Sequence, residues 1–227
     1  MYCDRCGAAV EPSAAKCLRC QLVFPQLAIA PSPHPRGAGA WVADGWNAVT
    51  ANFWTFVLLG LITMVAGGMV PVVLQGPVAL GLYWAALRQV QGHKAEVGDL
   101  SFGLNLFPAG VLICLVTGLI IGAATILLLL PGLVAATLLQ FPYLLAADRK
   151  LDFWEAIKES FQVSQRHFGS LLALLLLQIC LLVGGLLLCG VGLLVAVPIC
   201  YAATAAAYVD LFGIQAETRT RMASPSR

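Results

Sequence analysis

Four cysteines near the start of the chain are the side chains whose type and spacing are best suited to chemistry. Cys3 and Cys6 form one CxxC pair, Cys17 and Cys20 form a second, and ten residues separate the pairs. A CxxC turn brings two thiolates onto one ion, and two such turns complete a tetrahedral site of four sulfurs. A segment this short buries no core, so the metal would supply its folding energy. The spacing predicts one structural Zn²⁺ per chain, held by Cys3, Cys6, Cys17 and Cys20.

Two alternatives to zinc are open from the residues alone. Four sulfurs also suit iron, and the same thiols could form two disulfides or stay free. Residues 1–24 resemble the minimal zinc-ribbon module at the start of many bacterial membrane and regulatory proteins, although Gln21 follows Cys20 where that family usually has glycine. Acidic residues among the basic ones, and the negative charge of a four-thiolate zinc site, disfavour nucleic acid as a partner.

The rest of the chain has the composition of an integral membrane protein. Of 227 residues, 60% are hydrophobic and 11% are charged, whereas a soluble domain usually has about 25% charged residues. Asp, Glu, Lys and Arg are absent from residues 45–87, 100–147 and 167–209. Each stretch is about twice the ~20 residues that a helix needs to cross a bilayer, and each has a glycine or proline break near its middle. Three helical hairpins are therefore predicted.

The predicted fold class is an all-α polytopic membrane protein with about six transmembrane helices, preceded by a small N-terminal zinc ribbon. A flexible linker rich in Pro, Gly and Ala is expected at 25–40, between the ribbon (1–24) and a six-helix membrane domain (41–212), and a short basic cytoplasmic tail at 213–227. A tilted or re-entrant course is an alternative for the fourth span. The expected spans are 53–71, 73–90, 107–129, 132–147, 168–188 and 192–211.

The basic residues orient this arrangement. All 13 Lys and Arg residues lie before the first hairpin, between hairpins or after the last one. The positive-inside rule assigns these regions to the cytoplasm, so both termini are expected on the cytoplasmic side of the bacterial inner (plasma) membrane. The cytosol is reducing, which favours zinc over disulfides at the four cysteines.

Two connecting segments are predicted to lie at the membrane interface. Residues 152–168 form an amphipathic helix pattern, with Asp152 as N-cap and Glu155 completing a capping box. Trp41, Trp46 and Trp54 precede the first span, where aromatic belts form. Short packed connector helices are the alternative for both segments.

The membrane portion also resembles a known group of families. The motifs "QGPVALGLYWAALRQVQG", "GDLSFGLNLF", "LLPGLVAATLLQFPYLLAADRKLDFWEAIKESFQV" and "GVGLLVAVPICYAATAAAYVD" are similar to those of uncharacterised bacterial six-helix membrane families, which include relatives of the membrane domain attached to some glycerophosphodiester phosphodiesterases. The likeness covers roughly residues 41–212. This likeness implies a fold but does not supply any catalytic residue. The soluble phosphodiesterase domain is not in this sequence.

Polar residues elsewhere form two weaker sets of candidates. Several within the predicted spans are expected to make hydrogen bonds between helices: Gln140, Gln178, Thr117, Thr125, Thr137 and Thr204. Others in the cytoplasmic segments could converge as acid, base or metal ligands: His93, Asp99, Asp148, Asp152, Glu155 and His167. The second set comes from solvated segments, where charged residues belong in any case.

We therefore expect a non-catalytic membrane scaffold or adaptor, not an enzyme. Its partners would be the lipid bilayer and a cytosolic protein recognised by the zinc ribbon. The alternative is a protein that transports or handles a lipid or apolar solute, with the ribbon as an accessory. The sequence names neither that partner nor the oligomeric state.

Overall fold

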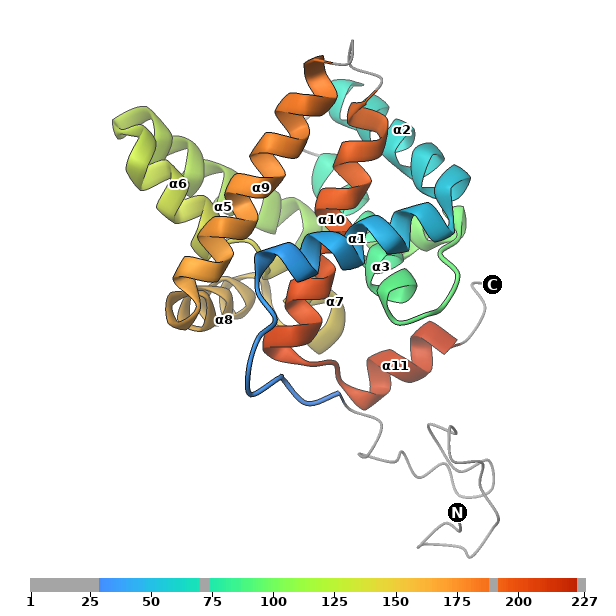
Figure 1. The fold of residues 1–227 in the computed structure, drawn as a ribbon. Coiled ribbons are helices and arrows are strands. Elements are labelled where there is room, and N and C mark those ends of the chain that lie inside the picture. The colour runs from blue at the N-terminus through green and yellow to red at the C-terminus, as the bar shows by residue number, and fades with distance from the viewer. Residues whose placement is uncertain (1–28, 70–73, 188–191, 224–227) are drawn as a thin grey trace, which may run out of the picture.

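The computed structural model describes residues 29–69, 74–187 and 192–223, and this part of the chain is helical (Figure 1). Within it, no strand is formed, and one isolated backbone bridge joins Ile29 to Ile214. The predicted zinc ribbon and its four cysteines lie outside the described residues. The helices are α1 (Ala38–Ala51), α2 (Phe53–Met69), α3 (Gln75–Val90), a short 3₁₀ turn η2 (Val97–Asp99), α4 (Leu100–Asn105), α5 (Phe107–Leu127), α6 (Leu129–Leu138), α7 (Pro142–Arg149), α8 (Phe153–Arg166), α9 (Phe168–Leu187), α10 (Leu193–Phe212) and α11 (Ala216–Ala223).

Four segments of the described chain are long and apolar enough to cross a membrane, as in a multi-pass membrane protein. They are Phe107–Ile126, Leu130–Arg149, Phe168–Leu187 and Leu193–Phe212. Helices α1 and α2 would add a fifth if they form one span, although the chain bends by 103° between them. The prediction of an all-α protein with several apolar spans is confirmed in this form.

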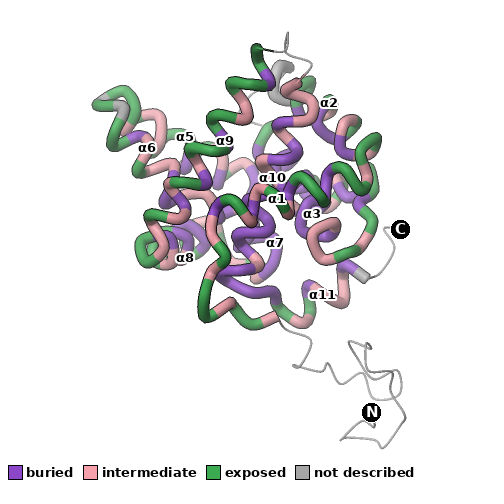
Figure 2. The backbone as a smooth tube through the Cα atoms, viewed as in Figure 1, coloured by how far each residue is buried: buried purple, intermediate pink, exposed green. Residues whose placement is uncertain are grey.

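The outer surface of these helices is strongly apolar. Ile126 is 89% exposed and Leu187 is 80% exposed. Exposed residues continue along α2, α5, α6 and α9 (Figure 2), and many of them are large and hydrophobic. So large an exposed apolar surface is unfavourable for a monomer in water, whereas acyl chains can cover it because they are themselves apolar.

Helices α3 and α10 form the centre of the molecule. Almost every residue of α3 from Gly76 to Arg88 is buried, and so is most of the second half of α10 (Figure 2). Small residues let other helices approach them closely. A Cβ at Gly45 of α1 would lie 2.7 Å from the backbone nitrogen of Ala203 in α10, so α1 crosses α10 almost backbone to backbone.

The fourth predicted span is a broken helix. Pro142 has no N–H, so the Leu138 carbonyl loses its usual helical partner and α6 ends there. Ser160 of α8 repairs the break: its hydroxyl donates to the Leu138 carbonyl at 2.9 Å and accepts from the Phe141 amide at 3.4 Å. The chain then continues as α7, with Pro142 at its start.

Helix α8 has features of both structures considered for residues 152–168, an amphipathic interfacial helix and a packed connector helix. Ala156, Ile157 and Ser160 are buried against the bundle, whereas Trp154 and Phe161 are exposed. The predicted capping box is wrong in its side-chain part. Asp152 is the N-cap residue, but its carboxylate makes no capping hydrogen bond, and the helix starts with the Ala156 amide on the Asp152 carbonyl.

Candidate functional site

Residues 29–37, here called the strap, run along the ends of α10 and α11. Ile29 and Ile214 exchange two backbone hydrogen bonds of 2.9 Å, and the Ser32 amide donates to the Asp210 carbonyl at 2.8 Å. Gly213 has φ +73°, and a Cβ there would overlap the Ile29 carbonyl oxygen. We expected a flexible linker at 25–40. Residues 29–37 are instead docked, and 38–40 begin α1, because the strap supplies donors to a buried acid; residues 25–28 lie outside the described part.

That acid is Asp210, in the last turn of α10. It accepts hydrogen bonds from the Ser32 hydroxyl at 2.6 Å, the Arg36 amide at 2.8 Å and the Trp41 indole N–H at 2.8 Å. The Arg36 guanidinium lies 3.6 Å from the same carboxylate and 2.9 Å from Asp44. A negative charge is unfavourable at a helix C-terminus, so these donors must offset both the dipole and the burial.

The two tryptophans of α1 and the one at the start of α2 divide between two roles. Trp41 was expected in an aromatic belt, but it is fully buried. An indole N–H in a protein interior needs an acceptor, and Asp210 supplies one. Trp46 and Trp54 are exposed, as expected of belt residues.

A second buried acid, Asp148, lies in the last turn of α7. The Tyr208 hydroxyl donates to its carboxylate at 2.8 Å, and the Thr218 hydroxyl of α11 donates to its backbone carbonyl at 2.8 Å. Lys150 donates to Glu217 at 2.7 Å and thereby lowers the pKa of that carboxyl. Part of the expected cytoplasmic tail is thus bonded to the end of α7, and Arg221 of α11 lies over the rings of Trp84 in α3 and Phe102 in α4.

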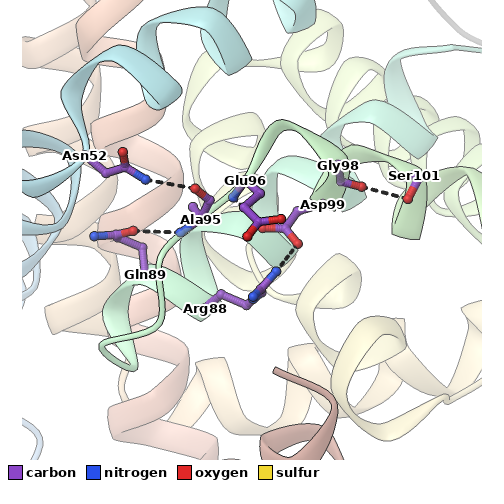
Figure 3. Close-up of polar contacts among 8 residues, drawn as sticks. All are labelled: Asn52, Arg88, Gln89, Ala95, Glu96, Gly98, Asp99 and Ser101. Atoms are coloured by element: carbon purple, nitrogen blue, oxygen red, sulfur yellow. Dashed lines mark hydrogen bonds and ion pairs between the residues drawn. The ribbon is translucent and has the colours of Figure 1, made fainter. Parts of the chain in front are cut away.

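A third cluster joins α3 to the segment before α4 (Figure 3). Arg88 donates to Asp99, and both side chains are buried. Ala95 is held on both sides: its amide donates to Gln89 at 2.9 Å, and its carbonyl accepts from Asn52 at 2.8 Å. The Asp210, Asp148 and Arg88 clusters are here called the basal network. The strap bonds to the first cluster, and Thr218 of α11 bonds to the second.

The structure does not bring the six cytoplasmic candidates together. Asp99 is paired with Arg88 and Asp148 with Tyr208, on different helices. Burial, and then the charges of Arg88 and Arg219, lower the pKa of His93. In residues 29–69, 74–187 and 192–223 no group of three His, Cys, Asp or Glu side chains could hold a metal. The ligand set predicted at Cys3, Cys6, Cys17 and Cys20 lies outside these ranges.

Polar side chains within the spans behave in three ways. The Gln178 amide donates to Thr204 at 2.9 Å, which confirms one predicted contact between helices. Thr117, Thr125 and Thr137 instead donate to carbonyls four residues earlier in their own helices, so the prediction was wrong for them. The side-chain amide of Gln140, at the α6–α7 break, has its nitrogen and oxygen buried and without a hydrogen-bond partner in the described structure.

A cluster of tyrosines was not anticipated. Tyr83, Tyr143 and Tyr201 come from α3, α7 and α10, and their rings meet with centroids 5.7 Å (Tyr83–Tyr143) and 4.4 Å (Tyr83–Tyr201) apart. Their spacing along the chain carries no periodic signal, because each lies on a different helix.

An apolar groove lies between the α5–α6 hairpin and α8. It has a volume of about 640 Å³. Its walls come from one residue of α5, from α6 and the start of the break, and from α8. They are Ile120, Leu130, Pro131, Val134, Ala135, Leu138, Leu139, Ile157, Lys158, Phe161 and Gln162. This site was not predicted, because three separate helices form it.

Part of the chain is similar to uncharacterised mycobacterial proteins. "Uncharacterized protein Rv2560" of Mycobacterium tuberculosis is 31% identical over 122 residues, which are 52% of this chain and 38% of that protein. "Uncharacterized protein Mb2590" of Mycobacterium bovis matches with the same identity and the same coverage. The chain therefore matches less than half the length of these relatives. No family model matches it, and no solved structure matches it significantly.

Proposed function

We propose that this chain is a multi-pass membrane adaptor in which a zinc ribbon recognises a cytosolic protein partner. The helices hold it in the bilayer, and Cys3, Cys6, Cys17 and Cys20 bind one structural Zn²⁺. The proposal is carried by the paired CxxC spacing at the start of the chain. A zinc ribbon that folds around its metal presents side chains in fixed positions without needing a hydrophobic core of its own.

The docked strap limits where the ribbon can act. Only eight residues separate Cys20 from Ile29. An extended chain advances at most about 3.6 Å per residue, so Cys20 stays within roughly 30 Å of Ile29. Ile29 is bonded to Ile214, between α10 and α11. A partner held by the ribbon is therefore kept close to the basal network.

The basal network supplies further support for a cytosolic location. The Arg36 amide bonds to Asp210 and Arg88 bonds to Asp99, while Arg149, which follows Asp148, donates to the Phe212 carbonyl at the end of α10. Basic residues at the ends of spans favour the cytoplasmic side. We therefore propose that the strap, α11 and the ribbon lie on the cytosolic side of a bacterial inner membrane.

Lipid handling is the second candidate function, and the groove between α6 and α8 favours it. The groove opens on apolar helix surface and holds one lysine and one glutamine. Such a groove can bind a lipid whether or not the protein transports that lipid.

The adaptor proposal is tested by capturing the full-length chain from its native membrane. Replacing Cys17 and Cys20 with serine removes two metal ligands, whereas Cys180→Ser alters an exposed thiol on α9. A cytosolic protein recovered with the wild type and with Cys180→Ser should fall by about tenfold or more with the double variant, because an unfolded ribbon loses its whole interface. Equal recovery of every cytosolic protein with all three chains would contradict the proposal.

A further inference from the structure

The groove between the α5–α6 hairpin and α8 has one polar end and is otherwise apolar. Leu130, Val134 and Leu138 follow one another along α6 at helical spacing and form its long wall. Lys158 and Gln162 lie on α8 one turn apart, and therefore on the same face of that helix. A ligand that fits this shape is apolar along most of its length and polar at one end.

The shape is fixed by the bundle. Ser160 lies on the face of α8 roughly opposite to Lys158 and Gln162, and its hydroxyl bonds both sides of the α6–α7 break. Ile157 is buried beside it. Helix α8 is therefore anchored to the wall it faces, and the groove is not a gap that closes when the helix shifts.

The charge at the polar end is positive. Lys158 is exposed, and in the described residues no ion pair or hydrogen bond engages its ammonium group. Glu159, its neighbour in sequence, is bound by Arg149. Glu155 borders an adjoining hollow with Lys158, and Asp152 stands at the start of the same helix. Arg166, two turns beyond Lys158, extends the basic side of the same helix.

The surroundings indicate a lipid. Both α5 and the segment containing α6 are candidate membrane spans. Val134 and Phe161, which line the groove, are exposed together with their apolar neighbours. A groove that opens on such a surface is filled by acyl chains, and a lysine beside it meets the phosphate of a headgroup.

We propose that this groove binds one anionic phospholipid from the leaflet on the side of the basal network. An acyl chain lies along α6, and the headgroup phosphate contacts Lys158 and Gln162. The inference depends on neither the zinc ribbon nor its partner, so loss of the partner in the capture experiment leaves it unaffected.

Native mass spectrometry of the full-length chain in detergent tests this site. The probes are dioleoyl phosphatidylglycerol and dioleoyl phosphatidylcholine at equal concentration. The wild type should retain one phosphatidylglycerol and prefer it by about fivefold, the effect of one lysine at a lipid headgroup. Lys158→Gln should abolish the preference, and Lys94→Gln, which alters an exposed lysine away from the groove, should keep it.

A second pair of variants tests the acyl chain. Val134→Trp fills the groove from a position that is 41% exposed, whereas Leu176→Trp places the same side chain on α9 at a position that is 46% exposed. We expect loss of the retained lipid in the first and wild-type retention in the second. Equal retention of the two lipids by the wild type, an unchanged preference in Lys158→Gln, or full retention in Val134→Trp would each overturn the proposal.

Discussion

An Asp210→Ala variant should lose about 3–5 kcal/mol of folding stability and release the strap. The substitution leaves the Ser32 hydroxyl, the Arg36 amide and the Trp41 indole without their acceptor. The Trp41 ring is fully buried, and a buried donor that has lost both water and its partner is costly, whereas the donors of Ser32 and Arg36 are only partly buried. In detergent, the melting temperature should fall on the order of 10 °C, and proteolysis should cut within residues 29–37.

Two milder variants provide the controls for Asp210. Asp210→Asn keeps one carbonyl oxygen as acceptor and should lose roughly half as much stability. Asp44→Asn removes the more exposed partner of Arg36 and should cost less than about 1 kcal/mol. If Asp210→Ala melted at the temperature of Asp44→Asn, the buried carboxylate would not be what holds the strap.

Replacing Gly103 with alanine should destabilise the chain by about 3 kcal/mol or more. A Cβ at this position of α4 would overlap the Pro77 carbonyl oxygen and lie 2.6 Å from the Gly81 nitrogen, both backbone atoms of α3. Backbone of a buried helix cannot move aside as a flexible side chain can, so α4 must separate from α3. Thermal unfolding in detergent measures the loss.

Gly122 of α5 is the matched control, because a Cβ there would meet nothing within 4 Å. Gly122→Ala should leave the melting temperature unchanged or raise it slightly, since alanine favours helix over glycine by about 1 kcal/mol. Equal melting of the two alanine variants would mean that α3 and α4 are not in contact at Gly103.

The helices of the membrane portion could be predicted because their signals are local. Uncharged runs longer than a bilayer requires mark the apolar segments. The break of the fourth one at Pro142 was not predicted, although a proline inside an apolar run is a local signal for it. Helix α8 follows from the spacing of its apolar residues. Each of these features is encoded within about twenty residues of the element that it specifies.

The basal network could not be predicted because its contacts join distant parts of the chain. Ser32 and Asp210 are 178 residues apart, and the proline-rich stretch around Ser32 has the composition of a linker. One local clue was present. Asp210 directly follows an uncharged run and lies near the end of α10, so its carboxylate needs hydrogen-bond donors from other segments. Until its acceptor is known, Trp41 is equally compatible with an exposed position in an aromatic belt and with a buried position in which the indole N–H is hydrogen-bonded.

The predicted metal site and the groove differ in how far apart in the sequence their determinants lie. The ligand set Cys3, Cys6, Cys17 and Cys20 is encoded in a spacing of a few residues, which makes it readable from sequence. The groove depends on how α8 is placed against α6, and that placement rests on the Ser160 contacts at the α6–α7 break. No pattern in α8 alone indicates them.

The metal content of the purified full-length chain tests the central claim most directly. Elemental analysis after gentle purification should find one zinc per chain in the wild type and in Cys180→Ser, and almost none in the Cys17→Ser, Cys20→Ser double variant. The membrane portion of the double variant should stay inserted and monodisperse. Less than about half an equivalent of zinc in the wild type, or a visible iron chromophore, would contradict the account.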